Sequence, residues 1–213
     1  MHGRLSLLGA GALAVLALPL ACSESTSPPG DGANGMVVVK LTDAPFLTDS
    51  LRSVDIFVVR VEGRVAAADS AEADANLDDG ASGGWRVLAS PNTMYDVLAL
   101  QNGATATLGS TAIAAGTYNG FRLIIDPSKS SVTLKNGVIL SGSSSPSVTF
   151  PSASRSGIKI LLAEPLQVVG DATTTLVVDF DVNNSFVMRG NAIAQNGLLF
   201  KPVIKGTMVG TGG

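Results

Sequence analysis

The segment Thr173-Thr-Thr-Leu-Val-Val-Asp-Phe-Asp-Val-Asn-Asn-Ser-Phe-Val187 carries the clearest strand pattern in the chain. From Leu176 onward every second residue is apolar, and this period of two is typical of a half-buried β-strand. The opposite face changes from hydroxyl to carboxylate as the strand ends, so Asp179 and Asp181 are expected to project from the same side. That side is either solvated or part of a site.

The composition favours an all-β domain around this strand. The 213 residues are 46% hydrophobic but only 15% charged, and 24 Gly and 10 Pro supply many turns. Short runs rich in Val, Ile and Thr recur along the chain, separated by turn signals such as Lys135-Asn136-Gly137. Asn-Gly predicts a hairpin turn with two positive φ angles. The sequence therefore predicts an antiparallel β-sandwich.

The N-terminus has the features of an export signal. A short basic start, Met1-His-Gly-Arg4, precedes an apolar run, Leu5–Leu18, that is too short for a comfortable membrane span. We predict that residues 1–21 are a signal peptide. The pattern resembles the bacterial lipoprotein signal, in which the cysteine after the cut receives diacylglycerol, so Cys22 is the predicted lipidation site. The alternative is an ordinary signal cut near Ala21, which would leave the thiol unmodified.

The remaining chain is expected to form one domain. Residues 22–35 are polar and predict a flexible tether, residues 36–206 the β-sandwich, and residues 207–213 a frayed tail. Within the domain, residues 66–84 are expected to form a long surface loop. Its acidic residues, which no basic residue accompanies, are Asp69, Glu72, Asp74, Asp78 and Asp79.

The charge and the residue types exclude several classes of function. Removal of residues 1–21 takes away Arg4 and the only histidine, His2, and leaves 13 basic against 17 acidic residues, a net charge of −4. An acidic chain of this kind is not expected to bind nucleic acid. Without histidine, and with Cys22 used as an anchor, neither a Ser-His-Asp or Cys-His centre nor a zinc site with such ligands is possible.

Carboxylates are the remaining candidates for a site. Asp43, Asp126, Asp179 and Asp181 stand at predicted strand ends and could supply oxygen ligands for calcium, the one cofactor that the sequence suggests. The alternatives are that Asp43 caps its own turn, or that Asp179 and Asp181 form ion pairs. The basic residues proposed for such pairs are Arg122, Lys159 and Arg189.

A hydrolase with paired carboxylates is a weaker alternative, because sugar substrates need aromatic platforms. The chain has one tryptophan and two tyrosines. Trp85, Tyr95 and Tyr118 are expected in the core or at corners rather than in a ligand site. Catalysis is therefore not predicted.

Six motifs in sequence resemble a family of bacterial lipoproteins and exported domains whose function is uncharacterised. They are Leu41-Thr-Asp-Ala-Pro45, Leu98-Ala-Leu-Gln-Asn-Gly103, Gly116-Thr-Tyr118 with Arg122-Leu-Ile-Ile-Asp126, Pro151-Ser with Ser156-Gly-Ile-Lys159, Val178-Asp-Phe-Asp181 with Ser185, and Lys201-Pro-Val203. The resemblance covers about Met36 to Lys205. It implies an immunoglobulin-like or transthyretin-like β-sandwich and an envelope location, and it implies no particular activity.

Together these observations predict an exported protein held on the cell envelope by an acyl chain in the lipid bilayer. Ser23, after the cysteine, is compatible with the outer membrane if the host has one. Three classes of function stay open: a module that binds a glycan or a protein, a structural envelope component, and an enzyme. A calcium-stabilised glycan-binding module is the specific alternative.

Overall fold

The computed structural model describes residues 33–43, 50–66, 84–151 and 156–212. The prediction of an all-β fold is confirmed, with 58% strand and 8% helix. The predicted signal peptide, Cys22, most of the tether and most of the acidic segment lie outside the described residues. Within the described part of the chain, no helix is long and apolar enough to cross a membrane.

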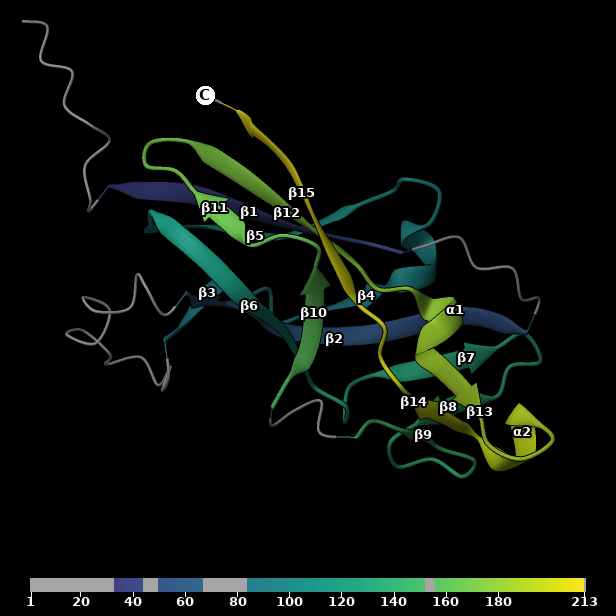
Figure 1. Ribbon diagram of the computed structural model, residues 1–213. Coiled ribbons are helices and arrows are strands. Elements are labelled where there is room, and N and C mark those ends of the chain that lie inside the picture. Colours follow the sequence, from purple (N-terminus) through teal and green to yellow (C-terminus); the bar gives the residue numbers. More distant parts are fainter. Residues whose placement is uncertain (1–32, 44–49, 67–83, 152–155, 213) are drawn as a thin grey trace, which may run out of the picture.

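Twelve strands form one curled sheet, and three form a small second sheet (Figure 1). The strands of the main sheet are β1 (Asn34–Thr42), β2 (Leu51–Val65), β3 (Trp85–Ala89), β4 (Thr93–Asp96), β5 (Ala106–Ala114), β6 (Gly116–Ile125), β7 (Ser131–Leu134), β8 (Ile139–Ser141), β10 (Ile158–Leu162), β11 (Leu166–Val168), β12 (Thr173–Asp179) and β15 (Lys205–Gly212). The small sheet holds β9 (Val148–Thr149), β13 (Phe186–Met188) and β14 (Leu198–Phe200). The helical turns are η2 (Val97–Leu100), α1 (Val182–Ser185) and α2 (Ile193–Asn196).

The main sheet is mixed rather than purely antiparallel. Its path is β5-β1-β12-β15-β10-β6-β2-β7-β8, with β3 and β4 attached to β2 and β11 attached to β6. β1 runs parallel to β12 and β10 runs parallel to β15. A parallel pair needs a long crossover, which most of the domain provides between β1 and β12. Side chains alternate with a period of two in parallel and in antiparallel strands alike, so the sequence pattern did not distinguish a mixed sheet from an antiparallel one.

The long strand β2 lies inside the sheet and carries apolar residues on both faces. It pairs with β3, β4, β6 and β7 along its length. The register shifts between Val58 and Arg60. This bulge changes which residues of β2 face the core: Val54, Ile56 and Val58 before it, and Val61 after it, all with 0% exposure.

Strand β12 and the residue after it have the inward-facing apolar side chains that the sequence predicted. Leu176, Val178 and Phe180 have no exposed surface. The Phe180 ring stacks on Phe200 with centroids 5.7 Å apart, and Phe186 lies 5.1 Å from Phe200 on another side. These aromatic rings connect the end of β12 to the small sheet, because Phe200, the ring partner of Phe180, lies on β14, and Phe186, which also contacts Phe200, lies on β13.

Three local expectations differ from the structure. The strand that begins at Thr173 ends at Asp179, and α1 follows, because Asp181 adopts a left-handed conformation with φ 34°. The hairpin at Asn136-Gly137 forms, but only Gly137 has a positive φ, since the Asn136 side chain accepts the Val138 amide instead. Residues 207–212, expected to fray, pair with β12 as part of β15 and supply that strand with its second neighbour.

Phe180→Ala should lower the free energy of unfolding by ~3–5 kcal/mol, because it opens a cavity among buried aromatic rings. Val187→Ala is the matched control: this side chain on β13 is 45% exposed, and its loss should change stability by less than about 0.5 kcal/mol. Chemical denaturation of the three proteins measures both effects. Equal losses in the two variants would contradict the assignment of Phe180 to the core.

Candidate functional site

The carboxyl ends of β1 and β12 meet at one edge of the sheet, because the two strands are parallel and Thr42 is opposite Asp179. Asp43 is the next residue after β1, and Asp181 follows β12 by two residues. Both are buried, with 3% and 6% exposure. We call Asp43, Asp179, Asp181 and Ser185 the strand-end cluster.

Asp43 joins three segments that are distant in sequence. Its Oδ1 accepts a hydrogen bond of 2.9 Å from the amide of Val182, and its Oδ2 accepts one of 3.4 Å from Nε2 of Gln101. Its own amide donates to the carbonyl of Leu100. The neighbouring Thr42 hydroxyl also contacts the Leu100 carbonyl, at 3.1 Å. One carboxylate therefore connects the end of β1, the loop after η2 and the turn after β12.

The other members of the cluster shape the turn after β12. Asp181 caps α1, where its Oδ1 accepts the amide of Asn184 at 3.2 Å. Asp179 Oδ1 accepts the amide of Asp181 at 3.3 Å. The Ser185 hydroxyl, fully buried, donates to the carbonyl of Phe180 and accepts the amide of Val203 at 2.9 Å. The prediction that Asp179 and Asp181 project together from one strand face is wrong, because the strand ends between them.

Burial raises the pKa of Asp43 from 3.8 to about 6, and the negative charges of Asp179 and Asp181 add to the rise. The hydrogen bonds from Val182 and Gln101 act in the opposite direction and stabilise the carboxylate. Asp43 therefore titrates near pH 6, well above an ordinary surface aspartate.

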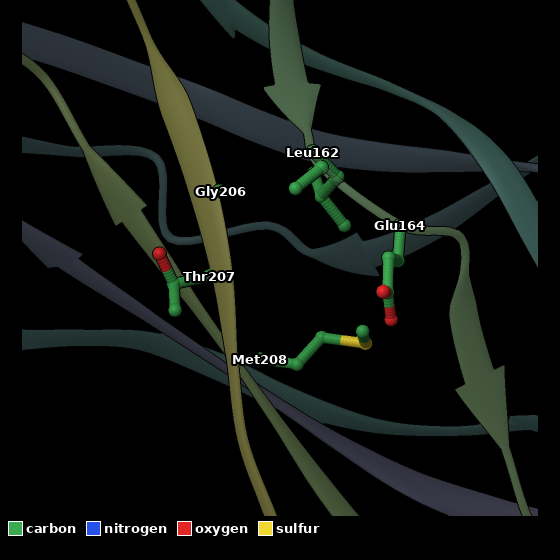
Figure 2. A pocket seen from close by; sticks show the side chains of 6 residues that line it. Leu162, Glu164, Gly206, Thr207 and Met208 are labelled. Atoms are coloured by element: carbon green, nitrogen blue, oxygen red, sulfur yellow. The ribbon is translucent and has the colours of Figure 1, made fainter.

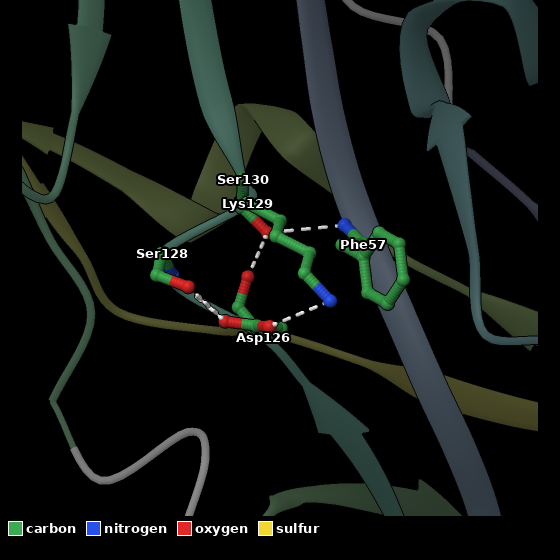
Figure 3. A network of polar contacts seen from close by, with 5 residues as sticks. All are labelled: Phe57, Asp126, Ser128, Lys129 and Ser130. Atoms are coloured by element: carbon green, nitrogen blue, oxygen red, sulfur yellow. Dashed lines mark hydrogen bonds and ion pairs between the residues drawn. The ribbon is translucent and has the colours of Figure 1, made fainter.

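Asp126 does not join this cluster and lies in a turn of its own (Figure 3). Its Oδ1 accepts the amide and the hydroxyl of Ser128, at 3.0 and 2.6 Å, and its Oδ2 lies 3.4 Å from Nζ of Lys129. The hydroxyl of Ser128, followed by the other contacts of this turn, lowers the pKa of Asp126. The Lys129 ammonium in turn lies 4.3 Å from the centre of the Phe57 ring. Of the four aspartates that the sequence suggested, the structure brings together three.

Ion pairing does not explain the clustered aspartates. Among the described residues, neither Asp179 nor Asp181 forms a salt bridge. Arg122 pairs with Glu62 instead, and Arg189 donates to the Thr149 hydroxyl. No group of three or more acidic, histidine or cysteine residues in the described part of the chain is arranged to hold a metal ion. The contacts described for the Asp43 carboxylate come from Val182 and Gln101, which are distant in sequence, so the cap of its own turn stays a prediction and calcium binding stays a hypothesis.

A second polar cluster was missed in the sequence. Glu62 on β2 is 3% exposed and pairs with Nε of Arg60 at 2.6 Å and with Nε of Arg122 on β6. The Arg122 guanidinium lies 4.1 Å from the centre of the Trp85 ring. The alternation of charged residues at 60, 62 and 64 was the available signal. Tyr118 is buried in the core as predicted, whereas Trp85 is only partly buried and lies outside it.

A hollow of about 230 Å³ lies where β10 and β15 separate (Figure 2). The two strands pair only at Leu161–Lys205 and Leu162–Gly206. The residues that line the hollow are Leu162, Ala163, Glu164, Gly206, Thr207 and Met208. Glu164 is the single charged group in this lining, so the hollow lacks the converging polar groups of an active site.

The fold and its strand-end cluster define an all-β domain whose buried polar residues connect strand ends. A family model described as a domain of unknown function, DUF4382, matches residues 34–202, and the chain belongs to this family. The resemblance to an uncharacterised domain family is thereby confirmed. No curated protein and no solved structure matches the chain.

The raised pKa of Asp43 predicts a pH dependence of stability. The folded chain binds this proton more tightly than the unfolded chain, so the contribution of Asp43 is fully present below pH 3.8 and is lost as pH rises through about 6. The difference in unfolding free energy between the wild type and Asp43→Asn should therefore change by roughly 2 kcal/mol between about pH 4 and about pH 7.5.

Asp171→Asn removes an exposed carboxylate next to β12 and is the control. Its stability should follow the wild type across the whole range of pH. Parallel pH profiles of the wild type and Asp43→Asn would contradict the assignment.

Wild-type melting curves with calcium and with a chelator should superimpose, because the clustered carboxylates already accept hydrogen bonds from the chain. A loss of stability in chelator that Asp43→Asn abolishes would establish a calcium site instead.

Proposed function

We propose that this chain is an exported, lipid-anchored β-sandwich that acts as a binding, adhesion or structural module and not as an enzyme. The observation that carries the proposal is the use of its buried carboxylates. Asp43, Asp181 and Glu62 each accept hydrogen bonds or ion pairs from the chain's own groups. The carboxylate of Asp96 likewise accepts the amides of Val54 and Leu98, both at 3.1 Å.

Asp43, with a pKa of about 6, is a candidate for acid–base catalysis. A general base must reach the proton that it removes from a substrate. Asp43 is 3% exposed, and both of its oxygens have partners within the protein. Its position therefore supports a structural role. A hydrolase with paired carboxylates remains the weaker alternative, and a calcium-stabilised glycan-binding module the other.

The proposed location is the cell envelope, with Cys22 as the lipidated residue after a signal peptide of residues 1–21. The described sheet begins at Asn34, only a short polar stretch after Cys22. In this arrangement the bilayer is one partner through the acyl chain, and a glycan or a protein is the proposed ligand of the domain.

Cys22→Ser should move the protein from the membrane fraction to the soluble fraction of its native host, because the variant cannot receive an acyl chain. Ser25→Ala, in the same polar stretch, should stay with the membrane. Fractionation and mass spectrometry of the N-terminal peptide measure both. A soluble wild type that begins at another residue would contradict the anchor.

The absence of catalysis is tested with the purified full-length chain and a panel of neutral and acidic polysaccharides. We expect no release of reducing ends above that of a heat-inactivated sample, because the buried carboxylates are occupied. Release of reducing ends that Asp43→Asn abolishes, with the variant folded by circular dichroism, would show that the chain is a hydrolase.

A further inference from the structure

The outer face of β3, β2, β6 and β10 carries a group of basic side chains from three strands. Arg122 on β6 lies opposite Glu62 on β2 and Lys159 on β10. Two residues along β2 from Glu62, Arg64 lies opposite Trp85 on β3. Side chains alternate between the two faces of a sheet. The neighbours Val61, Phe121 and Ile160 point into the core, so these residues point outward.

We call Arg60, Arg64, Arg122 and Lys159, together with Trp85, the cationic face. Arg64 and Lys159 are exposed, and the Arg60 and Arg122 side chains are 39% and 23% exposed. Glu62 lies among these four basic residues, so the five named charged side chains together carry a charge of +3. The whole chain has a net charge of −3. This contrast favours an anionic ligand at this face.

Glu62 fixes two of the guanidinium groups through one nitrogen each. Arg60 and Arg122 both present Nε to its carboxylate. Among the described residues, the terminal nitrogens of these two arginines, and the charged groups of Arg64 and Lys159, have no hydrogen-bond or ion-pair partner. A guanidinium has five N–H donors in a planar fork that matches a carboxylate. The arrangement therefore leaves oriented donors for a carboxylate from outside the protein.

An aromatic surface lies beside these donors. A side chain at Gly120 would come within 3.2 Å of Arg64 Cβ and 3.6 Å of the Trp85 ring, so this glycine leaves room for the indole to reach across β2. The Arg122 guanidinium lies over the same ring. Leu161, two residues beyond Lys159, is 51% exposed and adds apolar surface. Sugar rings have apolar faces that pack on such surfaces, whereas a simple inorganic anion needs the charges alone.

We propose that the cationic face binds a carboxylate-bearing polysaccharide such as a polyuronate, an inference that rests on the proposed function as a binding module. Arg60, Arg64 and Arg122 hold the carboxylates, Lys159 adds charge, and Trp85 holds the Arg122 guanidinium in place beside the bound sugar. An anionic membrane is less suited to this surface, because membrane binding by a folded domain uses several protruding apolar side chains beside its basic ones. Here Leu161 is the one large exposed apolar residue among the named positions.

The test measures binding of polygalacturonate to the full-length chain in detergent. Arg64→Gln with Lys159→Gln removes two exposed charges that have no partner among the described residues, so the fold should persist. Affinity should fall about tenfold or more, as expected for the loss of charged hydrogen bonds. The control pair Arg189→Gln with Lys201→Gln removes the same charge from the exposed surface near β13 and β14 and should bind as the wild type does.

Trp85 is the single tryptophan of the chain, so its fluorescence reports directly on the cationic face. Polygalacturonate should change the emission of the wild type and of the control pair, and neutral dextran should not. Unchanged affinity in Arg64→Gln/Lys159→Gln, equal loss in the control pair, or binding without a change in emission would overturn the inference. So would tighter binding of RNA, or of phosphatidylglycerol vesicles by the unacylated Cys22→Ser chain in detergent-free buffer, than of polygalacturonate. None of these outcomes involves release of reducing ends, which would instead contradict the proposed function.

Discussion

The hydrogen bond between the Asp43 carboxylate and the Val182 amide is the interaction on which the arrangement of the strand ends depends. The two residues are 139 positions apart, yet the parallel pairing of β1 with β12 brings both to the same edge. Phe180, between them, donates its amide to the Thr42 carbonyl at 3.0 Å and inserts its ring into the core. A chain that ends two parallel strands at one edge must satisfy buried backbone groups there, and Asp43 does so.

The family motifs correspond to the places where segments join. Asp43 connects the end of β1 to Gln101 in Leu98–Gly103 and to Val182, the residue after Val178–Asp181, and Ser185 connects to Lys201–Val203. The motif at Ser156–Lys159 meets β6: Gly157 has φ 73°, and an added Cβ would lie 2.5 Å from Ile124 Cδ1. Asp43, Gln101, Ser185 and Gly157 therefore hold segments together, whereas Arg122 and Lys159, which belong to two of the same motifs, lie on the outer face of the sheet.

The sequence predicted features that depend on local periodicity and did not predict those that depend on the path of the chain. Alternation identified the buried face of β12, and the Asn-Gly pair identified the turn at Asn136-Gly137. Alternation did not show that the strand ends before Asp181, because the pattern of apolar residues carries no information about a single residue with a left-handed backbone conformation. The cationic face was also missed, because its residues come from three strands and the net charge of the whole chain has the opposite sign. Register, which only the fold supplies, places Arg122 beside Glu62.

Amide hydrogen exchange at Val182, followed by NMR, is the most direct measurement of the central claim. In the wild type, the Val182 amide should be protected to a degree similar to the Phe180 amide, which bonds to the backbone of β1. In Asp43→Ala, protection of Val182 should fall while that of Phe180 persists. Rapid exchange of Val182 in the wild type, or protection that is unchanged in Asp43→Ala, would contradict the role given to Asp43.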